Sequence, residues 1–297
     1  MKLIALVGPT GAGKTEAGLA LAEVLGAEIV SCDSIAVYRG CDVGAAKPSL
    51  AERARVTHHV LDVADPRERF NAIDWVRHAE AALADIAARG RRALIVGGTG
   101  LYLRALVEGI AEAAAPDLEL RAELRAEAAS AGWPSLHARL VAVDPEAAAR
   151  IHPTDGVRIE RALEVHTLTG EPLSLWQARH RAEGPRHELR AVVLDPGAAL
   201  EERIAARTRA MLEQGLVEET RALLALGRDL KPLGALGYKE ALAHIDGRLT
   251  ADALPEVIRT ATRRFAKRQR NWFNQLKSAI RTTEKSQIPV EELARFR

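Results

Sequence analysis

An octapeptide near the start of the chain, GPTGAGKT at residues 8–15, limits the possible folds more than any other stretch. It has the spacing G-x-x-x-x-G-K-[ST] of a phosphate-binding loop, or P-loop. An apolar run at 3–7 precedes it, and an alanine-rich segment with helical periodicity follows at 16–25. Because a strand, a tight turn and a helix are the context that such a loop requires, we expect a diphosphate or triphosphate ligand. The candidate phosphate-binding residues are Gly8, Pro9, Thr10, Gly11, Ala12, Gly13, Lys14 and Thr15, with Thr15 also a ligand to Mg²⁺.

Length and composition favour a globular α/β protein of one embellished domain or two small ones, since the chain has 297 residues. Lys plus Arg at 42 against Asp plus Glu at 40 gives a formal charge of +2, so a nucleic-acid surface would need an uneven distribution of charge. Cys32 and Cys41 form no metal-ligand or disulfide pattern, which favours a reducing cytoplasm. We expect no export signal and no membrane span, because the apolar runs are too short.

Two polar side chains follow expected strands. Asp33 ends the run at 27–34, and Thr99 lies in a GGTG turn after the run at 93–96. The carboxyl ends of parallel strands meet at one edge of a sheet, so the two side chains should lie close together near the phosphate loop. The alternatives are that Asp33 caps the next turn through Ser34, which is the less favoured role, and that Thr99 is an ordinary turn residue.

The character of the chain changes between residues 112 and 188, where helical segments rich in Ala, Arg and Glu replace the alternation of strands and helices. A strand pattern returns at 189–196. We therefore expect an α/β core formed by 1–111 and 189–297, with a helical insertion at 112–188. Arg121, Arg158 and Arg161 of the insertion are candidates for contacts with a phosphate backbone, or are solvated surface arginines.

Two later helices carry basic residues. The helix expected at 199–213 places Arg203 and Arg207 four residues apart on one face, where one could contact the phosphates or form a surface salt bridge. The helix expected at 253–280 has no acidic residue between Arg259 and Arg281, which favours a polyanion contact. The tail after Thr282 is poorly patterned, and we expect it to be loosely held.

These features fit either a small-molecule kinase or a transferase whose leaving group is a pyrophosphate. A kinase should have an acidic residue at the end of its Walker B strand, whereas the run at 93–96 leads into Gly97. A kinase of small metabolites also has no use for the basic helix.

The chain resembles the tRNA dimethylallyltransferases, or IPP transferase family, along almost its whole length except the tail. The resemblance rests on GPTGAGKT, CDSIAVYRGCDVGAAKP, HHVLDVADP, IVGGTGLYLRALVEG, DPEAAARIHPTDGVRIERALEVHTLTGEPLS, GLVEE, ALGYKEAL and TRRFAKRQRNWF. It implies a P-loop NTPase-like parallel sheet flanked by helices, with the insertion contacting tRNA. Many members have Gln, Thr and Gln where this chain has Ala36, Ala45 and Val157, and eukaryotic members add a zinc finger that this chain lacks.

The resemblance also implies a reaction, in which a dimethylallyl group passes from dimethylallyl diphosphate to N6 of adenosine 37 in tRNAs reading codons that begin with U. Asp33 matches the general base, and Thr99 and Arg207 complete the catalytic set, with Mg²⁺ as cofactor. The positions that match tRNA contacts are Asp33, Ser34, Ile35, Ala36, Thr99, Arg121, Val157, Arg158, Ile159, Glu160 and Arg161.

The expected partners are the tRNA anticodon stem-loop and dimethylallyl diphosphate, bound by a monomer. The target base should be flipped out of the anticodon loop into a channel between the core and the insertion, and the basic C-terminal helix should hold the anticodon stem through its phosphates. An adenylate isopentenyltransferase acting on a free nucleotide and a P-loop kinase are the alternatives.

Overall fold

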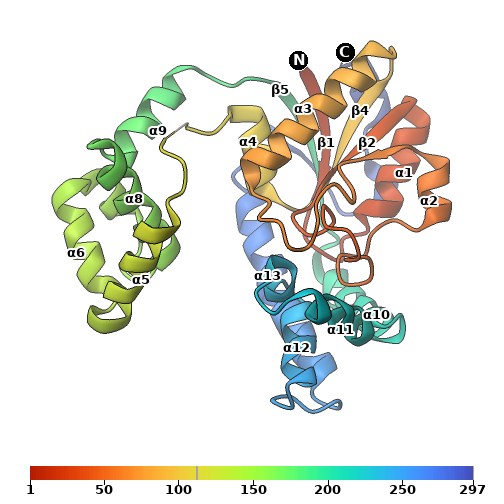
Figure 1. Ribbon diagram of the computed structural model, residues 1–297. Helices are drawn as coiled ribbons and strands as arrows, with labels where there is room; N and C mark the ends of the chain where they lie inside the picture. Colours follow the sequence, from red (N-terminus) through yellow and green to blue (C-terminus); the bar gives the residue numbers. More distant parts are fainter. Residues whose placement is uncertain (112, 297) are drawn as a thin grey trace. The chain divides into compact units, whose positions relative to one another are not determined.

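Six parallel strands form the central sheet of a computed structural model that describes residues 1–111 and 113–296 (Figure 1). The strand order is β3-β2-β4-β1-β5-β6, and every neighbouring pair runs in the same direction. The strands are β1 (Lys2–Val7), β2 (Ala27–Cys32), β3 (His58–His59), β4 (Arg92–Gly97), β5 (Glu188–Leu194) and β6 (Ile280–Thr282). The expected α/β fold with a parallel sheet is confirmed.

Helices connect these strands and form a separate cluster in the middle of the chain. Those before β5 are α1 (Lys14–Leu25), α2 (Leu50–Arg55), α3 (Ala72–Ala88), α4 (Gly100–Glu108), α5 (Leu118–Ala131), α6 (Trp133–Val143), α7 (Pro145–Arg150), α8 (Gly156–Thr169) and α9 (Leu173–Ala182). Those after it are α10 (Leu200–Glu213), α11 (Leu216–Leu226), α12 (Tyr238–Ile245), α13 (Leu254–Phe273) and α14 (Val290–Arg295). None of the helices in the described part of the chain has the length and apolarity that a membrane span needs.

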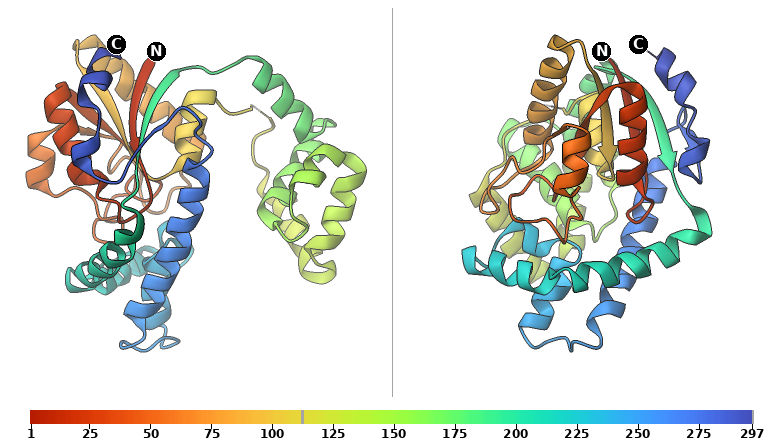
Figure 2. Two further views of the ribbon diagram at one scale, coloured as in Figure 1. Left: turned by 180° about the vertical axis from the view of Figure 1, so that it is seen from behind. Right: turned by 90° about the vertical axis from the view of Figure 1, so that its right-hand side faces the viewer.

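Both faces of the sheet are covered, which explains why its strands read as continuous apolar runs. Ile4 and Leu6 of β1 pack in a core cluster with residues of α1 and α14. The other face carries α3, whose Trp75 is fully buried and stacks on Tyr102 of α4 with ring centroids 5.1 Å apart. Figure 2 shows α1 and α14 on the side of the sheet opposite α3. The carboxyl ends of β2, β4 and β1 therefore lie next to one another at one edge of this layered core.

The tail differs from the sequence expectation, because it is part of the core. β6 extends the sheet beside β5, with Val193 opposite Arg281. Further on, Ile288 and the fully buried Leu293 pack against α1. The apolar residues of this segment are few and widely spaced, so its sequence shows no amphipathic pattern, although Ile288 and Leu293 belong to the same core cluster as residues of α1.

The basic helix α13 is also shorter than expected, since it ends at Phe273 and not near residue 280. Its buried stripe ends with Phe273, which is 1% exposed. Ile280 then begins an extended segment that pairs with β5, and this pairing requires the chain to leave the helical conformation first.

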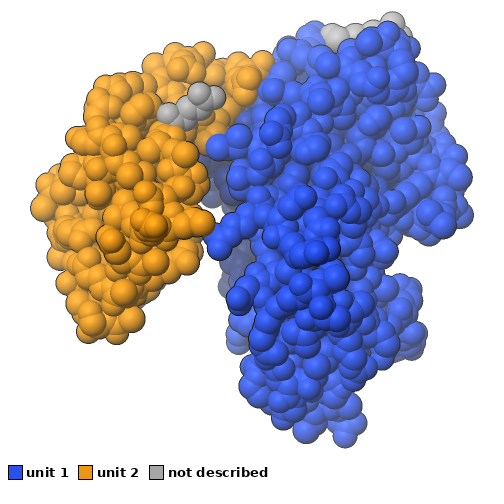
Figure 3. Space-filling model, viewed as in Figure 1, with its two compact units in different colours: residues 1–107, 187–297 blue, residues 108–186 orange. Residues whose placement is uncertain are grey.

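The chain forms two compact units (Figure 3), one of Met1–Val107 with His187–Arg297 and one of Glu108–Arg186. We call them unit 1 and unit 2. Unit 2 is all helical in its described residues and has its own apolar core, in which Leu124, Leu136, Leu140, Ile159 and Leu163 are nearly or fully buried. Because it buries its own core, unit 2 has the organisation of a domain.

Candidate substrate site

The phosphate loop joins β1 to α1, and its glycines are required by the geometry. A Cβ on Gly8 would lie 2.1 Å from the carbonyl oxygen of Leu194, so no side chain fits there. Gly13 caps α1 with φ of 87°, a left-handed conformation that costs glycine little. The loop therefore closes tightly over the end of β1 and leaves its backbone amides at the N-terminus of α1, which favours anion binding.

Lys14 supplies the positive charge of this loop. Its Nζ donates a hydrogen bond to the carbonyl oxygen of Pro9 at 2.8 Å, which folds the side chain back along the loop. Burial, together with the positive charge of Arg207, lowers the pKa of Lys14 from 10.5 to about 8. The ammonium group thus lacks a strong counter-charge in the protein, and a bound anion would provide one.

The two arginines that the sequence placed on one face of α10 have different positions. Arg203 donates from Nη1 to the carbonyl oxygen of Ala12 at 3.0 Å and so holds the outside of the phosphate loop. Arg207 lines the cavity in front of the loop. Burial lowers the pKa of Arg207, and the negative charge of Asp33 opposes that effect. Asp33 and Lys14 therefore both act electrostatically on Arg207, as expected of groups around one site.

Asp33 follows β2 directly and both of its possible roles are compatible with the structure. Its Oδ1 accepts the backbone N–H groups of Ile35 at 2.8 Å and Ala36 at 3.1 Å, so it does cap the turn. No described residue donates a hydrogen bond to Oδ2. One carboxylate oxygen is thus fixed by the backbone while the other stays available to a ligand.

Thr99 is held beside the segment that follows Asp33. Its Oγ1 accepts the backbone N–H of Ser34 at 3.1 Å, and its own N–H donates to the carbonyl oxygen of Cys32 at 3.1 Å. A Cβ on Gly97 would lie 2.1 Å from that same carbonyl oxygen, so the GGTG turn needs glycine to approach β2 this closely. The structure therefore brings Thr99 next to the Asp33 turn, at neighbouring strand ends.

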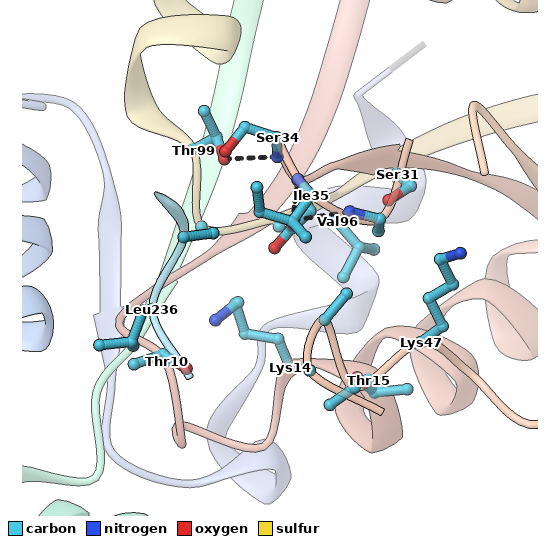
Figure 4. A pocket seen from close by; sticks show the side chains of 18 of the residues that line it. Thr10, Lys14, Thr15, Ser31, Ser34, Ile35, Lys47, Val96, Thr99 and Leu236 are labelled. Atoms are coloured by element: carbon cyan, nitrogen blue, oxygen red, sulfur yellow. Dashed lines mark hydrogen bonds between the residues drawn. The ribbon is translucent and has the colours of Figure 1, made fainter. Parts of the chain in front are cut away.

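These residues surround one cavity of about 600 Å³ in unit 1. In Figure 4, Lys14 and Thr15 lie below and the hydrogen bond from Ser34 to Thr99 lies above. The cavity is lined by predicted site residues, namely Thr10, Gly11, Gly13, Lys14, Thr15, Asp33, Ser34, Ile35, Ala36, Thr99 and Arg207. Apolar side chains line it as well, namely Ile29, Leu61, Val96, Leu236 and Phe265. The site can therefore accept a ligand with a charged end and an apolar end.

Gly8, Pro9 and Ala12 belong to the phosphate loop of unit 1 without lining the cavity, and the other predicted residues lie in unit 2, where most of them pair within the unit. Arg121 donates to Glu164 from Nε at 2.7 Å and from Nη2 at 2.8 Å, and Arg161 binds the same buried carboxylate. Ile159 is fully buried and Glu160 is 5% exposed.

Two predicted residues of unit 2 lie at its surface. Arg158 forms an ion pair with Asp155, and Val157 is 79% exposed at the start of α8. A tRNA contact through these positions stays a prediction.

The basic helix α13 is partly neutralised by carboxylates, two of which come from distant parts of the chain that the sequence of the helix does not reveal. Arg270 binds Asp195 with two hydrogen bonds of 2.7 and 2.6 Å. Arg263 pairs with Glu201, and Arg259 pairs with Glu256. Among the described residues, no carboxylate pairs with the exposed side chains of Arg264, Lys267, Arg268 and Lys277. We call these four residues the unpaired basic cluster.

Sequence reasoning missed two side chains that shape the cavity. Glu219 of α11 accepts three backbone N–H groups of the loop before Lys47, and Gln269 of α13 binds the phosphate loop itself. A signal existed for Gln269, because helical spacing places it on the buried stripe of Ile258, Thr262, Ala266 and Phe273. A buried polar side chain on such a stripe needs a partner.

The fold and the cavity define a parallel α/β protein of the P-loop class, with a site for a phosphorylated ligand beside a strand-end carboxylate. A family model described as "IPP transferase" matches residues 36–276, and one described as "Isopentenyl transferase" matches residues 1–65. The chain belongs to the IPP transferase family.

Individual relatives agree with this assignment. The tRNA dimethylallyltransferase of Geobacter metallireducens is 48% identical over 275 residues, which are 92% of this chain and 89% of the relative. The crystal structure of the tRNA isopentenylpyrophosphate transferase from Bacillus halodurans is 35% identical, with a TM-score of 0.71 and coverage of 99% of this chain and 95% of that one. A eukaryotic dimethylallyltransferase, in a study of its action on tRNA, has 26% identity, a TM-score of 0.76 and coverage of 96% and 75%.

Proposed function

We propose that the protein transfers the dimethylallyl group of dimethylallyl diphosphate to N6 of adenosine 37, in tRNAs that read codons beginning with U. The products are N6-(dimethylallyl)adenosine and diphosphate. The observation that carries the proposal is the single cavity in which the phosphate loop and Arg207 face a carboxylate, Asp33, next to apolar side chains. The polar end suits a diphosphate, and the apolar side chains suit a branched five-carbon chain.

In this reaction a bond forms between N6 and the allylic carbon, the bond from that carbon to the diphosphate oxygen breaks, and N6 loses a proton. Adenine N6 is a poor nucleophile because its lone pair is delocalised into the ring. Asp33 accepts the proton as the new bond forms, a role typically worth about 10²- to 10⁴-fold in rate. Its Oδ1 is already fixed by two backbone N–H groups, so Oδ2 is the atom proposed to take the proton.

The departing diphosphate gains negative charge in the transition state. The loop amides, Lys14 and Arg207 are fixed cations and dipoles that stabilise this charge without rearranging. The described residues contain no cluster of three or more His, Cys, Asp or Glu side chains that could hold a metal. Thr15 offers a hydroxyl at the cavity, which fits Mg²⁺ bound mainly by phosphate oxygens and water, and the bound ion would neutralise diphosphate charge.

For the acceptor, we propose the anticodon stem-loop of tRNA, with the target base flipped into the cavity. The unpaired basic cluster, three of whose residues lie on α13 and one just after it, supplies cations for the stem phosphates, and the exposed start of α8 is the proposed tRNA contact of unit 2. We further propose that the protein acts as a monomer in the cytoplasm, where its tRNA substrate is found.

A single-turnover assay with radiolabelled dimethylallyl diphosphate and Mg²⁺ tests the proposal. The acceptors are an anticodon stem-loop with adenosine 37 and, separately, free AMP. Asp33→Asn is the sharpest variant, because an amide oxygen still accepts the N–H groups of Ile35 and Ala36 while the base is lost. Asp33→Ala removes both functions.

We expect label in the stem-loop, with a rate that falls by at least about 10²-fold in both variants. Label in AMP alone would favour an adenylate isopentenyltransferase. No label in either acceptor, with consumption of ATP in a parallel incubation that contains it, would instead indicate a kinase. If Asp33→Asn were active and Asp33→Ala inactive, Asp33 would be a turn cap and not the base.

A further inference from the structure

One side chain of the basic helix binds two separate parts of the cavity wall. Oε1 of Gln269 accepts the backbone N–H of Thr10 in the phosphate loop at 2.8 Å. Nε2 of the same amide donates to the carbonyl oxygen of Gly98, in the turn that carries Thr99, at 2.9 Å. Gln269 is 8% exposed and lines the cavity. It therefore joins α13, the phosphate loop and the β4–α4 turn at one point.

The two partners fix the orientation and the identity of this side chain. Thr10 offers a donor and Gly98 offers an acceptor, so only a group with one acceptor and one donor at this spacing satisfies both. A Cβ on Gly98 would lie 2.5 Å from Nε2 of Gln269, so the turn approaches the amide as closely as glycine allows. A glutamate here would accept from Thr10, but its second oxygen would face the carbonyl oxygen of Gly98.

Each hydrogen bond leads to a different half of the reaction. Thr10 belongs to the loop proposed to hold the diphosphate. Gly98 is followed by Thr99, whose Oγ1 accepts the N–H of Ser34 next to Asp33. The leaving group and the base are therefore linked through one amide.

We propose that Gln269 is a positioning residue that sets the donor diphosphate and the general base at the distance that transfer requires. This inference rests on the proposed function. Gln269 lines the cavity together with Arg268 and Phe265, its neighbours on α13, but both ends of its amide are bound to backbone groups of the two segments, so it acts through them. Its loss should lower the rate of transfer more than the affinity for either substrate, because misplaced reactants still bind.

The matched pair of variants is Gln269→Met, which keeps the length of the side chain without hydrogen bonds, and Gln269→Glu, which keeps the acceptor and adds a negative charge. Gly98→Ala adds a methyl group that displaces the Gln269 side-chain amide, so it disturbs the same contact from the β4–α4 turn. Gln214→Met makes the same substitution at an exposed position after α10 and serves as the control. Four quantities are measured below the unfolding temperature of each variant: the single-turnover rate, the Kd for dimethylallyl diphosphate, the Kd for the stem-loop and hydrogen exchange of the Thr10 amide.

For Gln269→Met and Gly98→Ala we expect a rate at least about 10-fold lower, with both Kd values within about 3-fold of wild type. The Thr10 amide should exchange faster in Gln269→Met, a result that does not depend on activity. Gln269→Glu should in addition weaken binding of the diphosphate, because its charge faces the phosphate loop. A purely structural role would instead lower the unfolding temperature and affect the rate in proportion to the folded fraction.

The inference is overturned if Gln269→Met transfers label within about 2-fold of wild type, or if its loss of rate follows its loss of donor affinity. It is also overturned if exchange at Thr10 is unchanged. A wild-type protein that transfers no label to the stem-loop points to a different failure, that of the proposed function, and removes the basis of this inference with it.

Discussion

The hydroxyl of Tyr238 donates a hydrogen bond to Oε1 of Glu219 at 2.6 Å, in the fully buried surroundings of the Tyr238 ring. The same carboxylate accepts the backbone N–H groups of Asp42, Val43 and Gly44 at 2.8 to 2.9 Å. A Cβ on Gly44 would lie 2.2 Å from the Tyr238 ring. Two helices late in the chain thus fix the loop that forms one wall of the cavity.

The first prediction concerns this loop. Glu219→Gln keeps one acceptor but puts an amide donor against backbone N–H groups, so the loop should detach. We expect weaker substrate binding, with KM raised by roughly 10-fold, the order of one lost charge-assisted hydrogen bond. Tyr238→Phe removes one bond and should have the smaller effect. Steady-state kinetics with each substrate check this, and equal effects of the two variants would contradict it.

The second prediction is a pH dependence of donor binding. Because the pKa of Lys14 is lowered to about 8, the ammonium form is lost as the pH rises through that value. A diphosphate binds the ammonium form more strongly, so its affinity should fall by roughly 10-fold between pH 7 and pH 9. Calorimetric titration with dimethylallyl diphosphate measures this. Lys14→Met is the control, because the pH dependence of its affinity reflects only the ionisation of the ligand. If the affinities of the wild type and of Lys14→Met changed in parallel with pH, the effect would not come from Lys14.

The third prediction separates the α13 cations by their partners. Lys267→Gln and Arg264→Gln change residues of the unpaired basic cluster. For each variant, the plot of the logarithm of the association constant for the stem-loop against the logarithm of salt concentration should be less steep by about 1. The stability of the protein should be unchanged. Arg270→Gln should mainly lower stability, because it leaves Asp195 unpaired. Binding titrations at several salt concentrations, with thermal unfolding, distinguish the two outcomes. An unchanged slope for Lys267→Gln would place the stem elsewhere.

The fourth prediction concerns acid stability. Glu28 is 3% exposed, and its hydrogen bonds to Arg89 and His59 hold its pKa near 2, below the ordinary 4.5. A carboxylate whose pKa is lowered by folding stabilises the folded state at pH values above its pKa in the unfolded chain. This stabilisation is lost as the pH falls from 4.5 toward 2. Glu28→Gln should therefore cost on the order of 3 kcal/mol at pH 7 and progressively less at lower pH. Urea unfolding at several pH values checks the trend.

The sequence was sufficient for the parts of this structure that depend on local pattern. The phosphate loop, the strand ends at Asp33 and Thr99 and the helical middle segment all follow from residue spacing, because neighbouring residues determine turns and periodicity. Asp33 at the end of β2 approaches Thr99 after β4 because the two strands are neighbours and parallel, which the sequence also indicated.

The parts that could not be predicted depend on contacts between distant residues. Gln269 and Thr10 are 259 positions apart, and Glu219 and Asp42 are 177 apart, so no local pattern links them. The pairing of Arg270 with Asp195 also joins distant residues and could not be predicted from local sequence. The tail was misjudged because its stability comes from a place in an existing sheet and not from its own amphipathicity.

The N–H of His187 donates to the carbonyl oxygen of Val107 at 3.2 Å, so the chain leaves unit 1 and returns to it at nearly the same point. Everything between these two residues is, for the core, a single loop with closed ends. Its length and content can change without shifting β5 in the sheet, since the closure is already made by the backbone. Unit 2, which carries the proposed tRNA contact at the start of α8, can therefore vary in sequence while unit 1, which carries the cavity, keeps its fold.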